Sequence, residues 1–256
     1  MANMTEHEEQ KPGKQRRWGA VLAGAAALVL AIPMALHFAP RQSHDLRAAV
    51  TAPFIGKPVH AQQLAQFGQE PASQDARRLA NWVVASHDNG PSSFAVLDKV
   101  QAKVFLFDPQ GRLQAATPAV LGAAHGDDTV PGIGDKPLKD IGFEERTTPA
   151  GRFVASVGES SSRGEDVVWV DYDAAVSMHR IIKVPERLQA IATPQPEDNR
   201  LSYGCINLPD AFYEQALRPA VDRTGLVVYI LPETRSLAQT FASFRDVDMP
   251  LNLAQH

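Results

Sequence analysis

Short runs of β-branched and aromatic residues, separated by turn-forming residues, most limit what this chain can fold into. Lys103 to Asp108 and Arg112 to Leu121 flank the turn Pro109-Gln110-Gly111, a pattern that predicts a β-hairpin. Four more runs of this kind follow: Gly151 to Val157, Asp166 to Asp171, Ala175 to Ile181 and Leu226 to Leu231. Together they favour a mainly β domain, of the β-rich α+β class, with a few helices.

Helical periodicity is limited to two segments. Between Gln74 and Ser86 apolar residues recur at spacings of three and four, which predicts an amphipathic helix at about 74–87 that packs on the domain. Pro209 to Leu217 predicts a short second helix. The connection from Gly122 to Thr148 is rich in Gly and Pro, and a loop of this length in a compact domain usually frames a functional site.

The N-terminal region carries a candidate membrane segment. No Asp, Glu, Lys or Arg occurs in the 22 residues from Trp18 to Ala39, which is enough for a helix to cross a bilayer. Basic residues in the flank 1–17 predict that this flank stays cytoplasmic and that the rest is exported to the periplasmic face of the cell envelope. Residues 18–39 then contact the inner membrane as an anchor or act as a signal helix, and small residues near Pro33 leave cleavage open.

Composition and proline content complete the domain boundaries. We assign residues 40–94 to a linker that contains the amphipathic helix, residues 95–232 to the main domain and residues 233–256 to a C-terminal tail. A hydrophobic content of 44% suffices for an ordinary core, and a net charge of −4 argues against a nucleic-acid partner. The oligomeric state cannot be read from these features.

The only cysteine, Cys205, lies 26 positions after His179. A lone thiol cannot form an intrachain disulfide, and imidazole is the side chain best suited to take its proton near neutral pH. His179 is therefore the candidate base for a Cys205 nucleophile, and the backbone N–H groups of Gly204 and Cys205 are candidate donors to an oxyanion. The alternatives are a small buried residue at Cys205 and a hydrogen-bonded strand residue at His179.

With His179 upstream, the run Ser202-Tyr203-Gly204-Cys205-Ile206-Asn207 resembles the catalytic domain of the YkuD-like L,D-transpeptidases. The signature of that family is a histidine, a spacer, then Ser/Thr-His-Gly-Cys, an apolar residue and Asn or Arg. Thr148-Pro149-Ala150-Gly151-Arg152-Phe153 is similar to the Thr-Pro-x-Gly-x-Phe turn of the family. The resemblance covers roughly residues 95–232 and implies a YkuD-like β-sandwich or open barrel.

Two departures from the family pattern matter. Tyr203 stands where the family usually has a second histidine. The interval between histidine and serine is also longer than usual, so we expect its filling segment, Pro185 to Arg200, to cover or narrow the cleft.

The resemblance implies a peptidoglycan L,D-transpeptidase that needs no metal and no organic cofactor. Cys205 would attack the amide after the third residue of a tetrapeptide stem, the terminal D-Ala would leave, and a thioester would form. His179 would act as base and then as acid, with the backbone carbonyl of Arg180 orienting its ring. We assign substrate contacts to Ser202, Tyr203, Asn207, Arg180, Trp169 and Tyr172.

Alternatives to the transpeptidase remain open. An L,D-carboxypeptidase or endopeptidase of the same fold would use the same nucleophile, base and oxyanion donors. A second alternative is a non-catalytic, membrane-tethered peptidoglycan-binding protein, which would be consistent with Tyr203 in place of the usual histidine. His125-Gly126-Asp127-Asp128 offers too few ligands at a metal spacing, and we interpret it as a turn.

Overall fold

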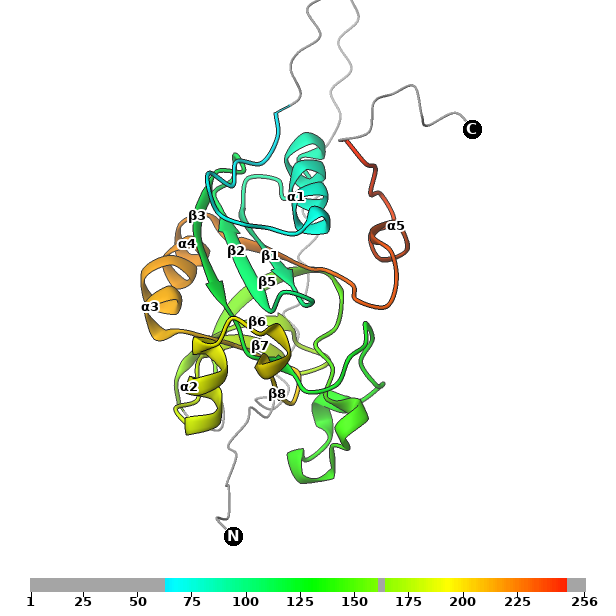
Figure 1. The fold of residues 1–256 in the computed structure, drawn as a ribbon, viewed down its shortest axis with the longest axis vertical. Coiled ribbons are helices and arrows are strands. Elements are labelled where there is room, and N and C mark those ends of the chain that lie inside the picture. Colours follow the sequence, from blue (N-terminus) through cyan, green and yellow to red (C-terminus); the bar gives the residue numbers. More distant parts are fainter. Residues whose placement is uncertain (1–62, 161–163, 248–256) are drawn as a thin grey trace, which may run out of the picture. The chain divides into compact units, whose positions relative to one another are not determined.

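The computed structural model describes residues 63–160 and 164–247, which lie in one compact unit built on an eight-stranded sheet (Figure 1). In sheet order the strands are β3(Leu113–Pro118), β2(Lys103–Phe107), β1(Ser93–Asp98), β10(Leu226–Ile230), β5(Gly151–Glu159), β6(Asp166–Asp171), β7(Val176–Arg180) and β9(Ile206–Leu208). Two short strands, β4(Leu121–Gly122) and β8(Arg200–Ser202), pair separately. The predominantly β architecture predicted from the strand pattern is confirmed.

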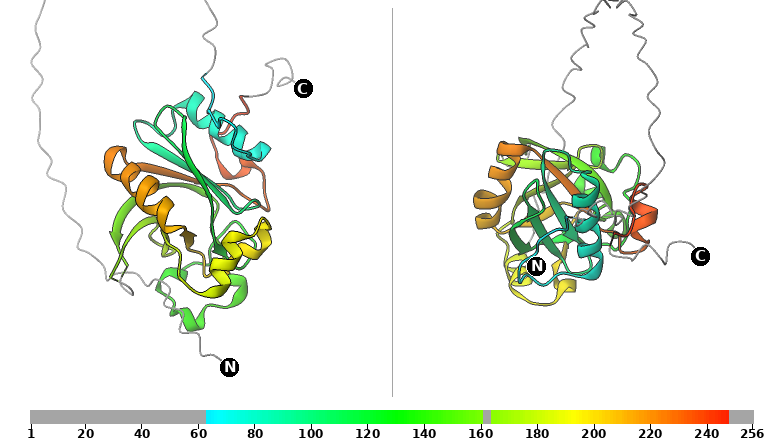
Figure 2. Two further views of the ribbon diagram at one scale, coloured as in Figure 1. Left: turned by 60° about the vertical axis from the view of Figure 1, so that its left-hand side comes forward. Right: turned by 90° about the horizontal axis from the view of Figure 1, so that it is seen from above.

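The large sheet curls around an inner core (Figure 2). Val104 of β2 and Met178 of β7, near opposite ends of the strand order, belong to one buried cluster. A continuous helical segment also contributes to this cluster; it consists of α3(Asp210–Phe212), the π-helical turn η5(Tyr213–Leu217) and α4(Arg218–Thr224). The short helix predicted at Pro209 to Leu217 therefore forms and runs on to Thr224.

The other face of β1, β2 and β10 carries a second buried cluster, rich in aromatic residues. Helix α1(Gln74–Ser86) covers this face, and Ser73 caps its first turn by accepting a hydrogen bond from the backbone N–H of Ala76. The segment after β10 contains α5(Leu237–Thr240) and buries Leu237, Phe241 and Phe244 in the same cluster. Residues 233–247 therefore pack as part of the domain, although we expected a tail, because these apolar side chains face α1.

Residues 18–39, predicted to enter the membrane, lie outside the described residues. Within residues 63–160 and 164–247, no helix combines the length and apolar character that a bilayer crossing needs. The segment Pro185 to Arg200 contains α2(Pro185–Ala192) and the 3-10 turn η4(Pro196–Asn199). Its apolar side chains pack against Val120 and Ile181.

Candidate active site

The pairing of β7 with β9 brings the two candidate catalytic residues to one face of the sheet. The strands run parallel, with Met178 opposite Ile206 and His179 opposite Asn207. Met178 and Ile206 are fully buried in the inner core. Because side chains alternate along a strand, Ser177 and His179 point to the opposite face of the sheet. Cys205, the residue directly before β9, lies on the same side, since its sulfur is 3.8 Å from Ser177 Oγ.

The thiol of Cys205 is 4% exposed and is surrounded by groups of β7 and the turn before it. Its sulfur lies 3.8 Å from Ser177 Oγ and 3.5 Å from the carbonyl oxygen of Ala175. Ala175 has a positive φ of 54°, a conformation that costs a residue with a side chain about 1–3 kcal/mol. A strained turn therefore forms one wall beside the sulfur.

The imidazole of His179 is fully buried and is held by main chain. Its Nδ1 lies 2.7 Å from the carbonyl oxygen of Arg180, the contact that the family resemblance implies. A carbonyl oxygen only accepts hydrogen bonds, so in the neutral ring the proton is on Nδ1 and Nε2 is the basic nitrogen. The ring is thus in the tautomer that can take a proton at Nε2.

Buried side chains hold the backbone of the turn that carries Cys205. Ser202 Oγ donates to the carbonyl oxygen of Cys205 at 2.7 Å and accepts from the N–H of Gly204 at 3.0 Å. Thr148 Oγ1 donates to the carbonyl oxygen of Gly204 at 2.9 Å. Gly204 has a φ of 135°, and a Cβ there would lie 2.8 Å from the carbonyl oxygen of Thr147. Only glycine fits this position without a shift of main chain.

These contacts change three expected roles. The N–H of Gly204 is engaged by Ser202 Oγ, so this geometry does not offer it to an oxyanion as we expected. Ser202 and Asn207 are fully buried and support the turn, although we expected them to contact substrate. Asn207 donates to the carbonyl oxygen of Cys205 at 3.4 Å and accepts from Arg187 Nη1 at 2.8 Å.

The side chain of Arg180 is used within the protein. Its guanidinium donates to Glu214 Oε1 at 2.5 Å and to Asp166 Oδ1 at 2.8 Å, and it lies 4.2 Å from the ring centroid of Tyr213. Two carboxylates already neutralise this charge, and they raise the pKa of Arg180 despite its partial burial. The expected contact of Arg180 with a substrate carboxylate does not fit this arrangement.

The two aromatic residues expected to line the cleft lie farther from the thiol. Trp169 is opposite Ser177 in the β6–β7 pair, so it shares the sheet face of Cys205. Its ring packs edge-on against Tyr172, with centroids 5.4 Å apart. Neither ring is among the groups that line the cavity at the sulfur.

The connection Gly122 to Thr148 covers the thiol with three 3-10 turns, η1(Ile133–Asp135), η2(Leu138–Asp140) and η3(Phe143–Glu145). A cavity of about 30 Å³ remains beside the sulfur, about the volume of one water molecule. Its walls are formed by Ile133, Gly134, Lys136, Leu138 and Ile141 of the connection and by Ala174, Ala175, Val176, Tyr203 and Cys205. We call residues 123–147 the covering loop.

The covering loop is the segment that narrows the site, and the prediction that Pro185 to Arg200 does so is wrong. No residue of Pro185 to Arg200 lines the cavity at the sulfur. This segment instead supplies Arg187, which is 1% exposed and donates a hydrogen bond to Asn207 Oδ1. Gly134 of the covering loop packs so closely on the β6–β7 turn that a Cβ would overlap the carbonyl oxygen of Asp173.

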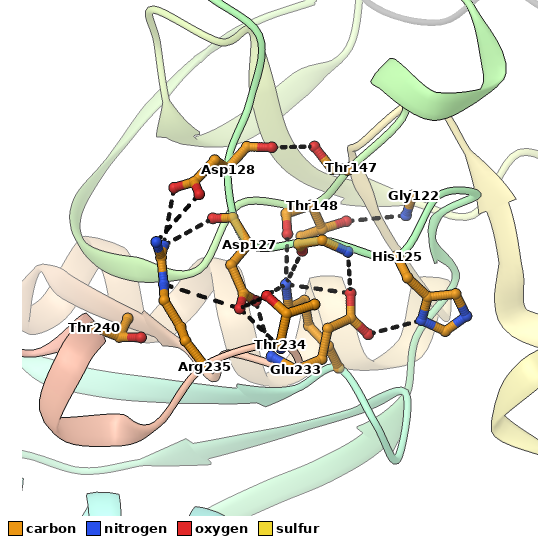
Figure 3. Close-up of polar contacts among 12 residues, drawn as sticks. Gly122, His125, Asp127, Asp128, Thr147, Thr148, Glu233, Thr234, Arg235 and Thr240 are labelled. Atoms are coloured by element: carbon orange, nitrogen blue, oxygen red, sulfur yellow. Dashed lines mark hydrogen bonds and ion pairs between the residues drawn. The ribbon is translucent and has the colours of Figure 1, made fainter.

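A buried ionic cluster ties both ends of the covering loop (Figure 3). Lys99 Nζ is fully buried and donates to Gly126 O at 2.5 Å, Asp127 Oδ1 at 2.8 Å and Thr148 O at 3.0 Å. It also lies 3.4 Å from Glu233 Oε1, which accepts from the N–H of Gly126 at 2.9 Å. We call these residues the Lys99 cluster; the sequence analysis missed it because it did not identify β1, which positions Lys99.

Burial and hydrogen bonding oppose each other at the two carboxylates of the Lys99 cluster. Burial disfavours ionisation of Asp127, but hydrogen bonds from Lys99, Thr234 and the backbone outweigh it and hold the pKa well below its ordinary value. Glu233 is likewise desolvated, and the N–H of Gly126 together with the charges of Lys99 and Arg200 lowers its pKa. Both groups are therefore carboxylates at neutral pH.

Comparisons with known proteins give fold-level likeness. No family model matches the sequence, and no curated protein matches it. The structure is similar to an L,D-transpeptidase from Enterococcus faecium, with 17% identity over 55% of this chain and 50% of that chain and a TM-score of 0.33. The chain resembles L,D-transpeptidase catalytic domains.

Two further solved structures are similar at the same level. For an L,D-transpeptidase from Mycobacterium smegmatis the identity is 17%, the coverage 55% of this chain and 58% of that chain, and the TM-score 0.32. For the helical cell shape determining protein Pgp2 from Campylobacter jejuni the identity is 13%, the coverage 59% of this chain and 54% of that chain, and the TM-score 0.38. The chain thus spans little more than half the length of these proteins.

Proposed function

We propose that this protein is a cysteine acyltransferase of the L,D-transpeptidase type that acts on peptidoglycan stem peptides. The observation that carries the proposal is the parallel β7–β9 register, which puts His179 and Cys205 on one sheet face. The hydrogen bond between His179 Nδ1 and Arg180 O adds to it, because it fixes the tautomer in which Nε2 is the basic nitrogen. The predicted export of the domain fits a substrate in the cell envelope.

In the proposed reaction His179 Nε2 takes the proton of the Cys205 thiol as the sulfur attacks the carbonyl carbon of the third stem residue. The C–N bond breaks, and the imidazolium gives its proton to the departing amine of D-Ala. A thioester remains on the sulfur. An acceptor amine, deprotonated by the imidazole, then attacks the thioester and releases the thiol.

We expect the covering loop to move when a stem peptide binds, because the space beside the sulfur, about 30 Å³, is much smaller than a peptide. Lys99 holds the two ends of this loop at Gly126 and Thr148. The movement therefore falls on the part of the loop between residues 128 and 145. In the same geometry, water in place of the acceptor amine would make the enzyme an L,D-carboxypeptidase.

The burial of Cys205 favours one further candidate, a peptidoglycan-binding protein without turnover. Only 4% of Cys205 is exposed in this conformation. A carbapenem distinguishes the acyltransferase from the binding protein, because an active thiol that the reagent can reach forms an adduct at Cys205. Absence of an adduct on folded wild-type protein would favour the binding protein.

The test incubates the full chain with tetrapeptide muropeptides and follows the products by mass spectrometry. Cross-linked dimers indicate transfer, and tripeptides without dimers indicate hydrolysis. We expect Cys205→Ala to abolish both products with little change in melting temperature, because removal of one sulfur opens little cavity. We expect His179→Ala to slow turnover by about 10²- to 10⁴-fold. Undiminished turnover in Cys205→Ala would refute the proposal.

A further inference from the structure

We propose that Arg146 binds the terminal carboxylate of the acyl donor and that the ring of Tyr203 holds it in place. The inference rests on the proposed function and adds the group by which the site selects its donor. Tyr203, the residue at the family's second histidine, lines the cavity at Cys205. The guanidinium of Arg146 lies 3.9 Å from the centroid of its ring.

The stack fixes the orientation of the guanidinium. An aromatic ring attracts a cation over its face and leaves the edge of the planar guanidinium, where its N–H groups lie, for hydrogen bonds. Tyr203 is two residues before Cys205 in the same turn. An imidazole at this position would offer a smaller face to the guanidinium than the ring of Tyr203 does.

Arg146 has no carboxylate partner in residues 63–160 and 164–247. The hydrogen bond of its side chain runs from Nη2 to the carbonyl oxygen of Ile141 at 3.3 Å, and its buried Nε has no partner there. By contrast, Arg180 and Arg200 each pair with at least one carboxylate at 2.8 Å or less. A partly buried cation without a counter-ion is unfavourable, so its place on the ring of Tyr203, which lines the cavity, points to an anionic ligand.

The charges around the cavity favour the same kind of ligand. Lys136 is the one charged side chain in the described lining, and its Nζ already lies 2.5 Å from Glu145 Oε2. No acidic side chain lines the cavity as the structure describes it. Arg146 is therefore the cation near the sulfur that remains for a bound anion.

The proposed substrate has a carboxylate in the matching position. In a tetrapeptide stem the carboxylate of D-Ala belongs to the leaving residue itself, directly after the amide that Cys205 attacks. A planar guanidinium can bind both oxygens of such a carboxylate. A donor that continues beyond this residue, or whose terminus is amidated, has no charge there. Arg146 would thus select donors with a free C-terminus at this position.

Arg146 lies on the fixed part of the covering loop. Its carbonyl oxygen accepts from the N–H of Ala124 at 3.0 Å, and a Cβ at Gly122 would overlap that oxygen. The next two residues are held as well, since Thr147 Oγ1 donates to Asp128 O and Thr148 belongs to the Lys99 cluster. The backbone of Arg146 can therefore stay in place while residues 129–145 move to admit a peptide, and the hydrogen bond from its Nη2 to the carbonyl oxygen of Ile141 is then released.

The test compares two donors on the full chain: a tetrapeptide stem with a free C-terminus and the same stem with a terminal amide. We expect wild type to prefer the free carboxylate by about 10- to 100-fold in kcat/KM, the range for hydrogen bonds to a charged group. Arg146→Met should bring the ratio of the two donors close to one. Arg146→Lys, which keeps the charge but not the fork, should give an intermediate ratio.

Arg112→Met serves as the charge-matched control, because Arg112 lies on the exposed hairpin turn and its side chain is 60% exposed. It should keep the wild-type preference. If neither donor is turned over by wild type, the proposed function itself fails. If wild type turns over both donors equally, or if the preference survives in Arg146→Met, the role of Arg146 is refuted and the acyltransferase stands. Melting curves verify that each variant is folded.

Discussion

The aromatic face under α1 and the polar region around the thiol hold the same sheet by different means. On the aromatic face Phe94 stacks on Phe107 at 4.7 Å, and Trp82 meets Tyr229 edge-on at 6.4 Å. Such contacts stabilise through buried area and tolerate small changes of shape. Around the thiol, directional hydrogen bonds from buried side chains fix individual backbone atoms. The molecule thus uses apolar area for stability and polar contacts for the geometry of the turn.

The largest loss of stability is expected when the buried charge of Lys99 is removed. Lys99→Met removes the buried cation of Asp127 and leaves Glu233 with Arg200 alone, and breaking a buried pair in this way costs about 3–5 kcal/mol. Urea unfolding at pH 7 measures the loss. Lys103→Met is the control, because Lys103 pairs with Glu70 at the surface and exposed pairs contribute about 0–1 kcal/mol.

Acid should narrow the difference between wild type and Lys99→Met. Asp127 and Glu233 have pKa values below their ordinary ones, so their contribution to stability is present above about pH 4. It is lost as pH falls through the lowered pKa values, since the protonated acids no longer need a cation. A difference in unfolding free energy that stayed constant from pH 7 to pH 3 would contradict this assignment of charges.

Thr148→Val should cost less stability than Lys99→Met, and its main effect should be on the rate of acylation. The change removes the hydroxyl that bridges the N–H of Gly122 and the carbonyl oxygen of Gly204. Leaving such buried groups unsatisfied costs about 1–3 kcal/mol. Because Gly204 precedes the nucleophile, we also expect slower acylation by a carbapenem. Thr148→Ser should restore most of the rate, and equal rates in all three proteins would show that the bridge does not position Cys205.

The smallest effect is expected on the aromatic face. Phe107→Leu keeps an apolar side chain of similar size in the cluster, and such changes usually cost less than about 1.5 kcal/mol. The acylation rate should stay at the wild-type value, because Phe107 contacts no group of the turn that carries Cys205. A rate that fell with Phe107→Leu as strongly as with Thr148→Val would remove the distinction between the two regions.

The sequence predicted the elements whose pattern is local. The hairpin β2–β3 has two runs of branched and aromatic residues around a clear turn, and α1 has a regular apolar stripe. Strand β1 escaped prediction because all six of its residues are buried, so it shows no alternation. A Lys directly after such a run was the available signal for the Lys99 cluster.

Around the thiol, the sequence identified the candidate nucleophile and base but not which groups support them. Ser202 and Asn207 were taken for substrate contacts because a motif does not distinguish residues that hold a turn from residues that meet a ligand. Arg146 was missed for a related reason. Its importance comes from a stack on Tyr203, 57 positions away in the chain, and from the absence of an acidic partner in the described residues.

The direction of β7 and β9 has a consequence for how such sites are recognised. Two strands that run the same way cannot be joined by a tight hairpin, so the chain must travel back along the sheet before β9 can start. The number of residues between His179 and Cys205 is therefore the length of the connection from β7 to β9. The length of the strands sets its minimum, and nothing in the sheet sets its maximum. Lengthening such a connection costs little closure entropy, which is how α2 could be accommodated. A sequence motif with a fixed number of residues between the histidine and the cysteine would therefore miss every chain with a longer connection.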